Sequence, residues 1–242
     1  MNIWTYWENP IGKSMPPYIQ LCLDSLKRQN PDLIILTPET LSKYIDNLHP
    51  NFSTLGRIAH RADCIRVAIV EKHGGWWIDA DTVGLRPIEN LKIASSSHLL
   101  YSRWKDGRVL NGYFYGQRKS PIMVRWLEYI NTKLFFSRGD VSWTAFGEGI
   151  LTPLVFDPKY KDNCIEIPLT TFLPLDINAS PRTFFDNVSH EPFIKENSIC
   201  FGLNHSWFND HVPDLLDMSV ETIIESNTLI GSLFNKTKKE LR

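Results

Sequence analysis

Apolar residues in the first part of the chain recur with spacings that predict alternating strands and helices. Ile3 to Trp7 is a short aromatic run that predicts a first strand, and Tyr18 to Arg28 has one apolar face, as a helix would. The continuous run Leu33 to Leu36 suits a strand buried on both faces of a parallel sheet. A second helix is expected over Glu39 to Leu48. This order of elements is typical of an α/β fold.

The longest helical pattern, Thr54 to His73, leads directly into another predicted strand. Its apolar residues form one narrow stripe along the helix: Ile58, Ala62, Ile65 and Ile69. Gly74 and Gly75 predict the end of the helix, because glycine adopts the left-handed conformation of a C-terminal cap at little cost. Trp76 to Ala80 is therefore expected to be a strand entered straight from a helix, with both tryptophans mainly in the core.

The pattern becomes mixed in the second part of the chain. Leu99 to Tyr101 and Gly112 to Gly116 predict strands, and Ile122 to Lys133 predicts a helix. Short segments interrupted by proline follow, up to about residue 215. The expected fold class is α/β, with a mostly parallel central sheet flanked by helices and a mixed C-terminal part, in a single domain over residues 1–242.

Composition narrows the classes of partner. The 242 residues are 43% hydrophobic, which suffices for one sizeable core. Lysine and arginine number 26 against 27 aspartates and glutamates, so the net charge of −1 argues against nucleic acid as a partner. The four cysteines are scattered, which predicts free thiols. The first ten residues lack the features of a signal peptide and no apolar run is long enough for a membrane span, so a cytoplasmic location is expected.

Two carboxylates, Asp79 and Asp81, stand at the end of the predicted strand Trp76 to Ala80. Residues two apart on a strand point to the same side, and like charges that close repel unless a cation lies beside them. Carboxylates completed by phosphate oxygens of a substrate are the usual way in which proteins hold Mg²⁺, and Mn²⁺ has the same preference for oxygen. A solvated surface turn is the alternative interpretation of this spacing. Asp63 and Arg66 share one face of the preceding helix and would lie beside this strand end.

These residues belong to a longer pattern. His60 to Arg66, followed by Glu71 to Asp81, resembles the signature of DXD-type glycosyltransferases. That group includes the capsular polysaccharide synthesis transferases, the initiating mannosyltransferases of yeast and the clostridial glucosylating toxins. Further blocks are similar to the capsular group: Ile3 to Glu8, Cys22 to Ser25, Asn30 to Asp32, and Asn204 to Trp207. The resemblance covers most of the first 92 residues and implies a GT-A-like fold.

The resemblance also implies a divalent metal, Mn²⁺ or Mg²⁺, and a nucleotide-diphosphate sugar, either a UDP-sugar or a GDP-sugar. Asp81 would be the direct metal ligand, and Asp79 would reach the ribose or the metal through water. His205 is a candidate third ligand, and Asn204 could take that contact instead.

The other implied site residues fall into two sets. The catalytic candidates are Asp63, Arg66 and Asn111. The candidates for binding the donor nucleotide sugar are Trp4, Thr5, Trp7, Asp63, Arg66, Asp79, Ser206 and Trp207. For Asp63 with Arg66, a plain ion pair on the helix face is the alternative, and one of Trp4 and Trp7 could simply belong to the core. A platform for the acceptor sugar could come from Trp104, Tyr113, Tyr115 and Trp143, although the two tyrosines could equally alternate on an ordinary strand. Glu148 stands where the family has a proline, which leaves its role open.

The implied function is that of a metal-dependent, retaining glycosyltransferase that adds a hexose to a growing, lipid-linked surface polysaccharide. Residues 1–92 would form the nucleotide-sugar-binding half, 93–215 the acceptor-side half and 216–242 a C-terminal helix with a basic tail. The tail, residues 235–242, suits either a solvated end or a peripheral contact with the inner face of the membrane. The oligomeric state is expected to be a monomer or a small homo-oligomer.

Three other functions fit parts of the sequence. A glycosyltransferase with a protein acceptor would use the same donor chemistry. A carbohydrate-binding module would bind sugar without turnover and without need of metal or nucleotide. A two-metal phosphohydrolase would need further Asp or His ligands that the pattern lacks.

Overall fold

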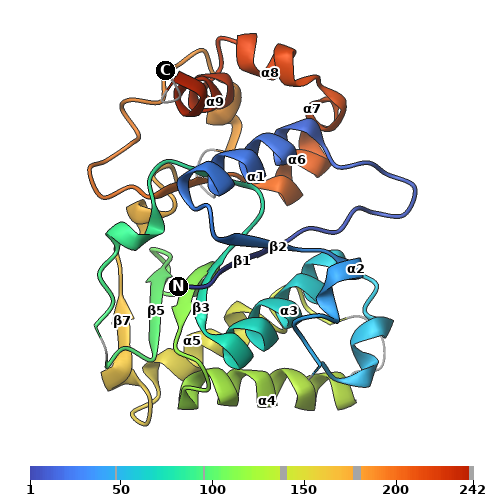
Figure 1. Ribbon diagram of the computed structural model, residues 1–242, viewed down its shortest axis with the longest axis vertical. Helices are drawn as coiled ribbons and strands as arrows, with labels where there is room; N and C mark the ends of the chain where they lie inside the picture. The colour runs from blue at the N-terminus through green and yellow to red at the C-terminus, as the bar shows by residue number, and fades with distance from the viewer. Residues whose placement is uncertain (47, 95, 137–140, 177–180, 240–242) are drawn as a thin grey trace. The chain divides into compact units, whose positions relative to one another are not determined.

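The computed structural model describes residues 1–46, 48–94, 96–136, 141–176 and 181–239 (Figure 1). The chain divides into two compact units. Unit 1 contains residues 1–10, 32–79 and 92–168, and unit 2 contains residues 11–31 and 80–91 and the chain from residue 169 onward. One of the boundaries falls directly after Asp79, inside the Asp79-Ala80-Asp81 segment. The prediction of a single domain stays a prediction.

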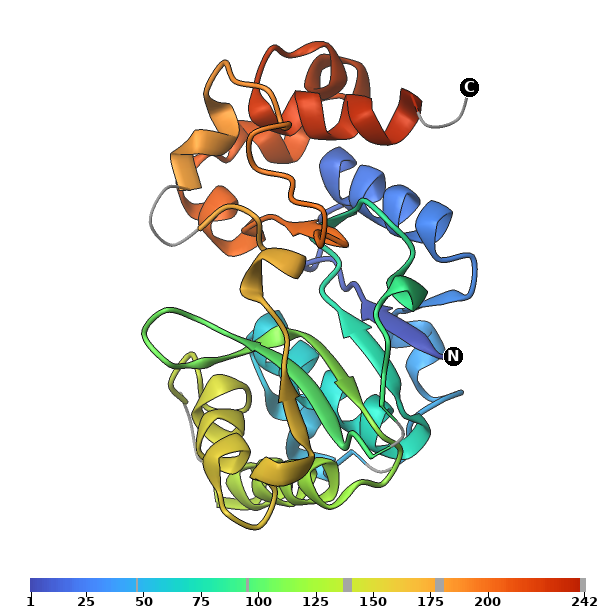
Figure 2. The ribbon, with the colours of Figure 1, turned by 90° about the vertical axis from the view of Figure 1, so that its left-hand side faces the viewer.

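Unit 1 is built on a six-stranded sheet with the strand order β2-β1-β3-β6-β5-β7 (Figures 1 and 2). The strands are β1 Ile3–Tyr6, β2 Leu33–Leu36, β3 Gly75–Ile78, β5 Leu99–Arg103, β6 Val109–Gly116 and β7 Cys164–Glu166. Strand β1 pairs in parallel with both β2 and β3, and β5 pairs in parallel with β7. Strand β6 is antiparallel to β3 and β5. The parallel opening of the sheet, expected from the order of elements, is therefore present.

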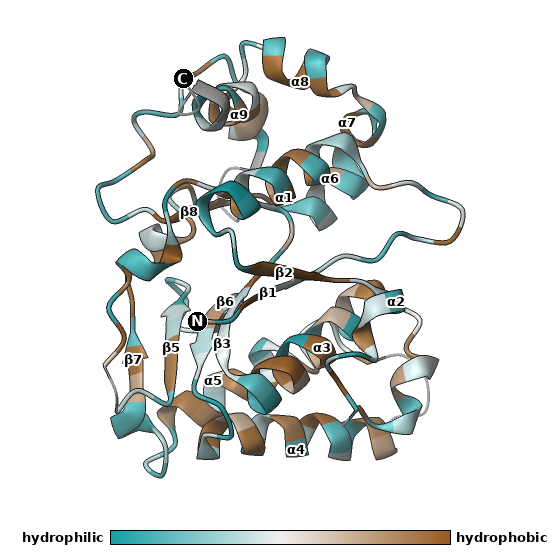
Figure 3. Ribbon diagram, in the orientation of Figure 1, coloured by the Kyte–Doolittle hydropathy of each residue, from teal (hydrophilic) through white to brown (hydrophobic). Residues whose placement is uncertain are grey.

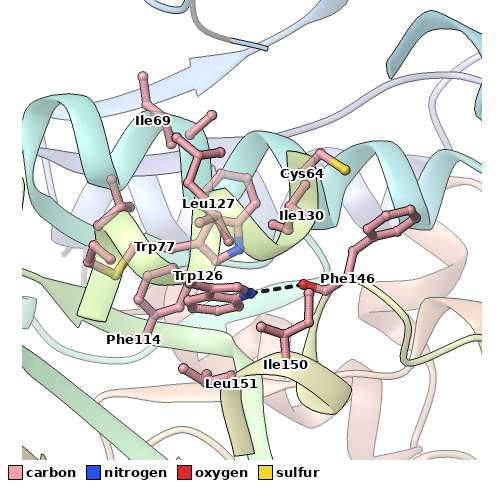
Figure 4. Packing of buried hydrophobic residues seen from close by; sticks show 14 of the residues in the cluster. Cys64, Ile69, Trp77, Phe114, Trp126, Leu127, Ile130, Phe146, Ile150 and Leu151 are labelled. Carbon is pink, nitrogen blue, oxygen red and sulfur yellow. Dashed lines mark hydrogen bonds between the residues drawn. The ribbon is translucent and has the colours of Figure 1, made fainter. Parts of the chain in front are cut away.

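Four α-helices belong to unit 1: α2 Pro38–Leu41, α3 Ile58–His73, α4 Pro121–Phe136 and α5 Glu148–Phe156. Helices α3, α4 and α5 share one cluster of buried residues with alternate positions of the strands, such as Trp77 of β3 and Phe114 of β6 (Figure 4). Because side chains alternate along a strand, Trp76 and Tyr115 lie on the opposite face, where their rings are 5.8 Å apart. Both Trp76 and Trp77 are buried, as the sequence predicts.

Helix α3 ends where its sequence predicts. Gly74 has φ +70° and Gly75 has φ +112°, a region that side chains with a Cβ rarely adopt. A Cβ at Gly75 would also overlap the backbone of Asn2, so the pair lets β3 pass close to β1. The helix is buried more completely than one narrow stripe suggests, because Asp63 to Val70 is buried without interruption.

Two sequence predictions about helices are wrong in their extent. The helix expected over Glu39 to Leu48 is a single turn, α2, followed by hydrogen-bonded turns that end near Ile45. The helix expected from Thr54 begins only at Ile58, after a separate 3₁₀ turn over Pro50–Thr54. The edge strand β2, which is strongly apolar in Figure 3, is fully buried only at Leu33 and Leu36.

Unit 2 combines a long helix with a two-stranded sheet and short helices. Its elements include α1 Pro17–Gln29, β4 Thr82–Gly84, β8 Cys200–Gly202, α6 His205–His211, α7 Asp214–Asp217, α8 Val220–Glu225 and α9 Leu229–Lys239. Strand β4 is antiparallel to β8. The backbone N–H of Gly84 in β4 donates a hydrogen bond to the Ser25 hydroxyl of α1. The basic tail is helical as far as Lys239, and residues 240–242 lie outside the described residues.

Short 3₁₀ turns complete the two units: Ile88–Asn90, Lys161–Asn163, Leu169–Thr171 and Pro181–Phe185. Throughout the described chain, no helix has both the length and the apolar content that a membrane crossing requires.

Candidate active site

Three of the predicted site residues meet at one end of the sheet in unit 1. Asp63 and Arg66 come from α3, and Asn111 comes from β6. The Asn111 amide donates a hydrogen bond of 2.8 Å to Asp63 Oδ1, and Arg66 Nη1 donates one of 2.8 Å to the Asn111 carbonyl oxygen. Arg66 Nη1 also lies 3.3 Å from Asp63 Oδ1. The i, i+3 pair predicted from the helix is therefore an ion pair that also holds Asn111.

Asp79 joins the same group from the end of β3. Arg66 Nη2 lies 3.1 Å from Asp79 Oδ1, so one guanidinium contacts two carboxylates. The indole N–H of Trp77, two residues earlier on the strand, donates a hydrogen bond of 2.7 Å to the same Asp79 oxygen. The Arg66 guanidinium also lies over the Trp77 ring, 5.3 Å from its centre. Trp77 therefore belongs to the core and also orients the carboxylate, a second role that the sequence did not suggest.

The buried carboxyl of Asp63 titrates near neutral pH. Its exposed fraction is 7%, and burial raises the pKa of Asp63 to about 6 from an ordinary value of 3.8. Arg66 and the Asn111 hydrogen bond lower this pKa, whereas the charges of Asp79 and Glu148 raise it further. Asp63 therefore titrates closer to neutral pH than an ordinary aspartate, so the charge of a bound ligand can shift its protonation.

Two glycines allow the close packing of this group, because a Cβ would collide with it. A Cβ on Gly147 would overlap the Asn111 amide nitrogen, and a Cβ on Gly112 would overlap Asp79 Oδ2. Gly147 directly precedes α5, so the start of this helix is brought against Asn111. The sequence analysis assigned no role to either glycine.

Glu148, the first residue of α5, connects the group to the hairpin turn between β5 and β6. Its Oε1 accepts a hydrogen bond of 2.9 Å from the Trp104 indole, and its Oε2 lies 2.7 Å from Arg108 Nη1. A carboxylate can accept several such bonds at once, whereas the proline expected in the family could accept none. Glu148 thus holds this turn beside the Asp63 group, a role that the sequence left open.

The other predicted aromatic residues of the acceptor platform are placed differently from one another. Tyr113 is buried, Tyr115 packs against Trp76, and Trp143 is 54% exposed with its ring 6.3 Å from that of His60. Tyr113 and Tyr115 thus alternate with Phe114 along β6, as residues of an ordinary strand do.

The candidates on β1 are mainly internal. Trp4 is buried, donates its indole N–H to the Gly74 carbonyl oxygen at 3.0 Å, and packs edge-on against Tyr44. Thr5 is buried, and its hydroxyl has no hydrogen-bond partner among the described residues. Trp7 is half-buried and donates a hydrogen bond to Asn9. Trp4 therefore has the core role that was one of its two alternatives.

A second group of predicted residues forms in unit 2, where β4 and β8 pair. Asp81 directly precedes β4, and His205 lies three residues after β8. The backbone N–H of His205 donates a hydrogen bond of 2.9 Å to Asp81 Oδ2, and the Leu203 N–H donates one of 2.9 Å to the Asp81 carbonyl oxygen. Asp81 and His205, two of the three candidate metal ligands in this unit, are thus neighbours.

Tyr18 of α1 is part of this second group, although no sequence pattern predicted it. Its hydroxyl forms a short hydrogen bond with Nδ1 of the His205 ring. Burial raises the pKa of Tyr18, and the nearby charge of Asp81 raises it further, so the phenol stays neutral. Burial also lowers the pKa of His205. No sequence spacing could have connected the two, because 187 positions separate them.

The remaining residues of the C-terminal block have different surroundings. The Asn204 side-chain oxygen accepts the backbone N–H of Trp207 at 3.1 Å and caps the helix. Trp207 stacks on His211 with their rings 4.6 Å apart, and Ser206 is exposed. The amide oxygen of Asn204 therefore has a structural function of its own.

The donor atoms of the second group fit a hard divalent cation. A carboxylate and a neutral imidazole are both accepted by Mn²⁺, and Mg²⁺ and Mn²⁺ commonly complete their coordination with water and phosphate oxygens. Within the described ranges, no cluster of three or more His, Cys, Asp and Glu side chains is arranged to hold a metal. Asp81 and His205 would therefore hold the ion together with a ligand rather than enclose it.

Comparison with known proteins gives a match to one family model and a relative that is similar to part of this chain. The model of the family described as capsular polysaccharide synthesis protein matches residues 1–131. The O-glycosyltransferase braB of Annulohypoxylon truncatum is 26% identical over 154 residues, which are 52% of this chain. This chain spans only 36% of the length of that relative.

Among solved structures, the glycosyltransferase PaToxG superposes with a TM-score of 0.50 at 15% sequence identity, over 66% of this chain and 71% of that one. At this identity the likeness concerns the fold alone. It confirms the expected α/β, GT-A-like fold class.

Proposed function

Because the chain belongs to the capsular polysaccharide synthesis protein family, we propose that it is a metal-dependent, retaining glycosyltransferase. It moves a hexose from a UDP- or GDP-sugar to a growing, lipid-linked surface polysaccharide at the cytoplasmic face of the membrane. The observation that carries this proposal is the group in unit 1, where Asp63, Arg66 and Asn111 share hydrogen bonds and a buried ion pair. The family match and the GT-A-like fold support the same class of reaction.

In this proposal the group in unit 1 binds the sugar of the donor. A carboxylate accepts hydrogen bonds from hydroxyls and a guanidinium donates them, so Asp63 and Arg66 together can orient a hexose ring. Arg66 is fixed from several sides by Asp63, Asp79 and Asn111, so little side-chain entropy remains to be lost on binding. Asn111 lies at the same place and would contact the reacting part of the sugar. Asp79 would contact the ribose.

Asp81 and His205 would hold the divalent metal in unit 2. When bound, the metal neutralises the charge that grows on the diphosphate leaving group. Hydrogen bonds from the backbone N–H groups of Leu203 and His205 to Asp81 hold these two segments together. Ser206 and Trp207, at the start of α6, would donate hydrogen bonds to the same diphosphate.

The test is slow hydrolysis of nucleotide sugars, which requires no acceptor. UDP-glucose, UDP-galactose, UDP-N-acetylglucosamine and GDP-mannose are incubated singly with the full chain, with Mn²⁺ or with EDTA. We expect Mn²⁺-stimulated hydrolysis of at least one donor, with a sugar product that first appears in the anomeric configuration of the donor, as followed by NMR. Hydrolysis of none of them, or equal rates with EDTA, would contradict the proposal.

Matched variants assign the activity to the residues. Asp81→Asn keeps the shape of the side chain and should reduce Mn²⁺-dependent hydrolysis to background. Asp46→Asn removes an exposed carboxylate that is ion-paired with Lys72, away from the proposed site residues, and should have no effect. Saccharide binding that is indifferent to EDTA and to nucleotide, without hydrolysis, would instead indicate a carbohydrate-binding module.

A further inference from the structure

The contact between Tyr18 and His205 joins two distant parts of unit 2. Tyr18 lies in the first turns of α1, and His205 is the first residue of α6. The Tyr18 side chain is fully buried, its ring packs edge-on against Phe208, and its hydroxyl bonds to His205 Nδ1. A buried ring held by packing has one orientation, so its hydroxyl is a fixed point for the imidazole.

The backbone of His205 is fixed by a different contact. Its N–H donates to Asp81 Oδ2, and the Asp81 carbonyl oxygen accepts from Leu203. These bonds fix the position of the His205 backbone, but they do not determine the rotation about its side-chain bonds. A contact to the ring itself sets its orientation, and Tyr18 Oη supplies such a contact.

We propose that Tyr18 is a positioning residue for the metal site, and that it orients the His205 imidazole by holding Nδ1 while Nε2 ligates the divalent metal. This inference rests on the proposed function, because it takes the metal dependence from it. Histidine ligands in metalloproteins commonly have their second ring nitrogen bonded to a group that fixes the ring, and loss of that group commonly weakens metal binding by about 10–100-fold.

The test uses Mn²⁺ alone as the probe, on the full chain. Free Mn²⁺ is followed by electron paramagnetic resonance during titration of the wild type, Tyr18→Phe and Tyr101→Phe. Tyr18→Phe keeps the ring and removes only the hydroxyl, so we expect Mn²⁺ affinity to fall by about 10-fold or more. Tyr101 is a similarly buried tyrosine in β5 of unit 1, and Tyr101→Phe should bind Mn²⁺ like the wild type.

A second measurement needs no Tyr18 variant. Electron spin-echo modulation of Mn²⁺ bound to the wild type should show coupling to an imidazole nitrogen, and His205→Ala should remove it. Wild-type protein that binds no Mn²⁺, bound Mn²⁺ without nitrogen coupling, or unchanged affinity in folded Tyr18→Phe would each overturn the inference.

The failure of the inference can be told apart from failure of the proposed function. Nitrogen coupling that is lost in His205→Ala, together with weaker Mn²⁺ binding by Tyr18→Phe, in a protein that hydrolyses no nucleotide sugar, would support the role of Tyr18 and contradict the transferase. Mn²⁺-stimulated hydrolysis without nitrogen coupling would support the transferase and contradict the role of Tyr18.

Discussion

The side chains of the unit 1 group carry an excess of negative charge in a mostly buried place. Arg66 is the cation between two carboxylates, Asp63 and Asp79, and its Nε has no hydrogen-bond partner within the described part of the chain. Burial raises the pKa of Asp63, Arg66 lowers it, and the charge of Asp79 raises it further, because one guanidinium does not neutralise both carboxylates.

The first prediction concerns the charge of Asp63. Its pKa is 3.8 in the ordinary case and about 6 in the fold, so the folded protein binds the proton more tightly. The stability that this raised pKa of Asp63 contributes is present in full below about pH 4 and is lost as the pH rises through 6. Asp63→Asn should therefore be more stable than the wild type at pH 7 to 8, by an amount on the order of 3 kcal/mol for two pKa units.

Urea unfolding of both proteins between pH 4 and pH 8 measures this difference. It should approach zero at the acidic end and grow through pH 6, while the variant loses hydrolysis. A variant that is less stable than the wild type at pH 8 would show that the Asp63 charge is fully compensated in the fold.

The second prediction concerns Gly147. Gly147→Ala would place a Cβ on the Asn111 amide nitrogen and should displace that side chain from Asp63. We expect donor hydrolysis to fall about 10–100-fold, since displacement of a positioning group by about 1 Å costs rates of this order. Gly56→Ala, at a glycine with open space around it, is the control and should hydrolyse the donor normally. Equal activity in both variants would contradict the close packing of Asn111 on α5.

At the scale of elements, the site depends on helices that pack in the core and also place residues at the end of the sheet. Helix α3 places Asp63 and Arg66 in the group while its remaining faces pack in the core. Helix α4 supports the site indirectly, because the Trp126 indole N–H donates a hydrogen bond of 2.9 Å to the carbonyl oxygen of Phe146 (Figure 4). That bond fixes the backbone immediately before Gly147.

The third prediction follows from this bond. Trp126→Phe removes the indole N–H and leaves the buried Phe146 carbonyl oxygen without this hydrogen bond. This loss should lower the free energy of unfolding by about 1–3 kcal/mol. Donor hydrolysis should fall as well, because Gly147 and Asn111 lose their backbone support. Tyr129→Phe, on the exposed side of the same helix, should change the stability by less than about 0.5 kcal/mol. Denaturant unfolding and donor hydrolysis are measured on the same samples, and full hydrolysis by stable Trp126→Phe would disprove the coupling.

In the whole molecule, each of the two units contains some of the residues proposed to bind the donor or the metal. The group of Asp63, Arg66, Asn111 and Asp79 lies in unit 1, and Asp81, His205 and Tyr18 lie in unit 2. A ligand that binds only the folded protein stabilises it according to its concentration and affinity, wherever in the chain its contacts arise. Thermal unfolding of the full chain therefore reports donor binding without need of an acceptor.

The fourth prediction is a metal-dependent thermal shift. At 100 times its dissociation constant, a ligand adds about 2.7 kcal/mol, and in a protein of this size each kcal/mol raises Tm by roughly 2–4 °C. UDP or GDP with Mn²⁺ should therefore raise Tm by roughly 5–10 °C, and EDTA should abolish the shift. The effects of UDP and GDP, measured separately, identify the base of the donor. A shift of the same size in EDTA would contradict a metal-bridged diphosphate.

The sequence by itself determined the local features of this protein. The i, i+3 spacing of Asp63 and Arg66 and the glycine end of α3 depend on residues close in the chain, and periodicity reports such residues well. The parallel opening of the sheet joins distant strands, but the alternation of strands and helices along the chain predicts it. The extents predicted for α2 and for the start of α3 are wrong, because apolar periodicity does not determine where a helix begins or ends, and packing decides those ends.

Only the tertiary structure decided which distant groups meet. Trp77 and Glu148 complete the surroundings of the unit 1 group, and Tyr18 reaches His205 across 187 positions. These contacts have no period or spacing, because they arise when separate elements pack on one another and bring buried polar groups to a partner. The chemistry of the residues is written in the chain, but their partners, and hence the pKa of Asp63 and the orientation of His205, exist only in the folded protein.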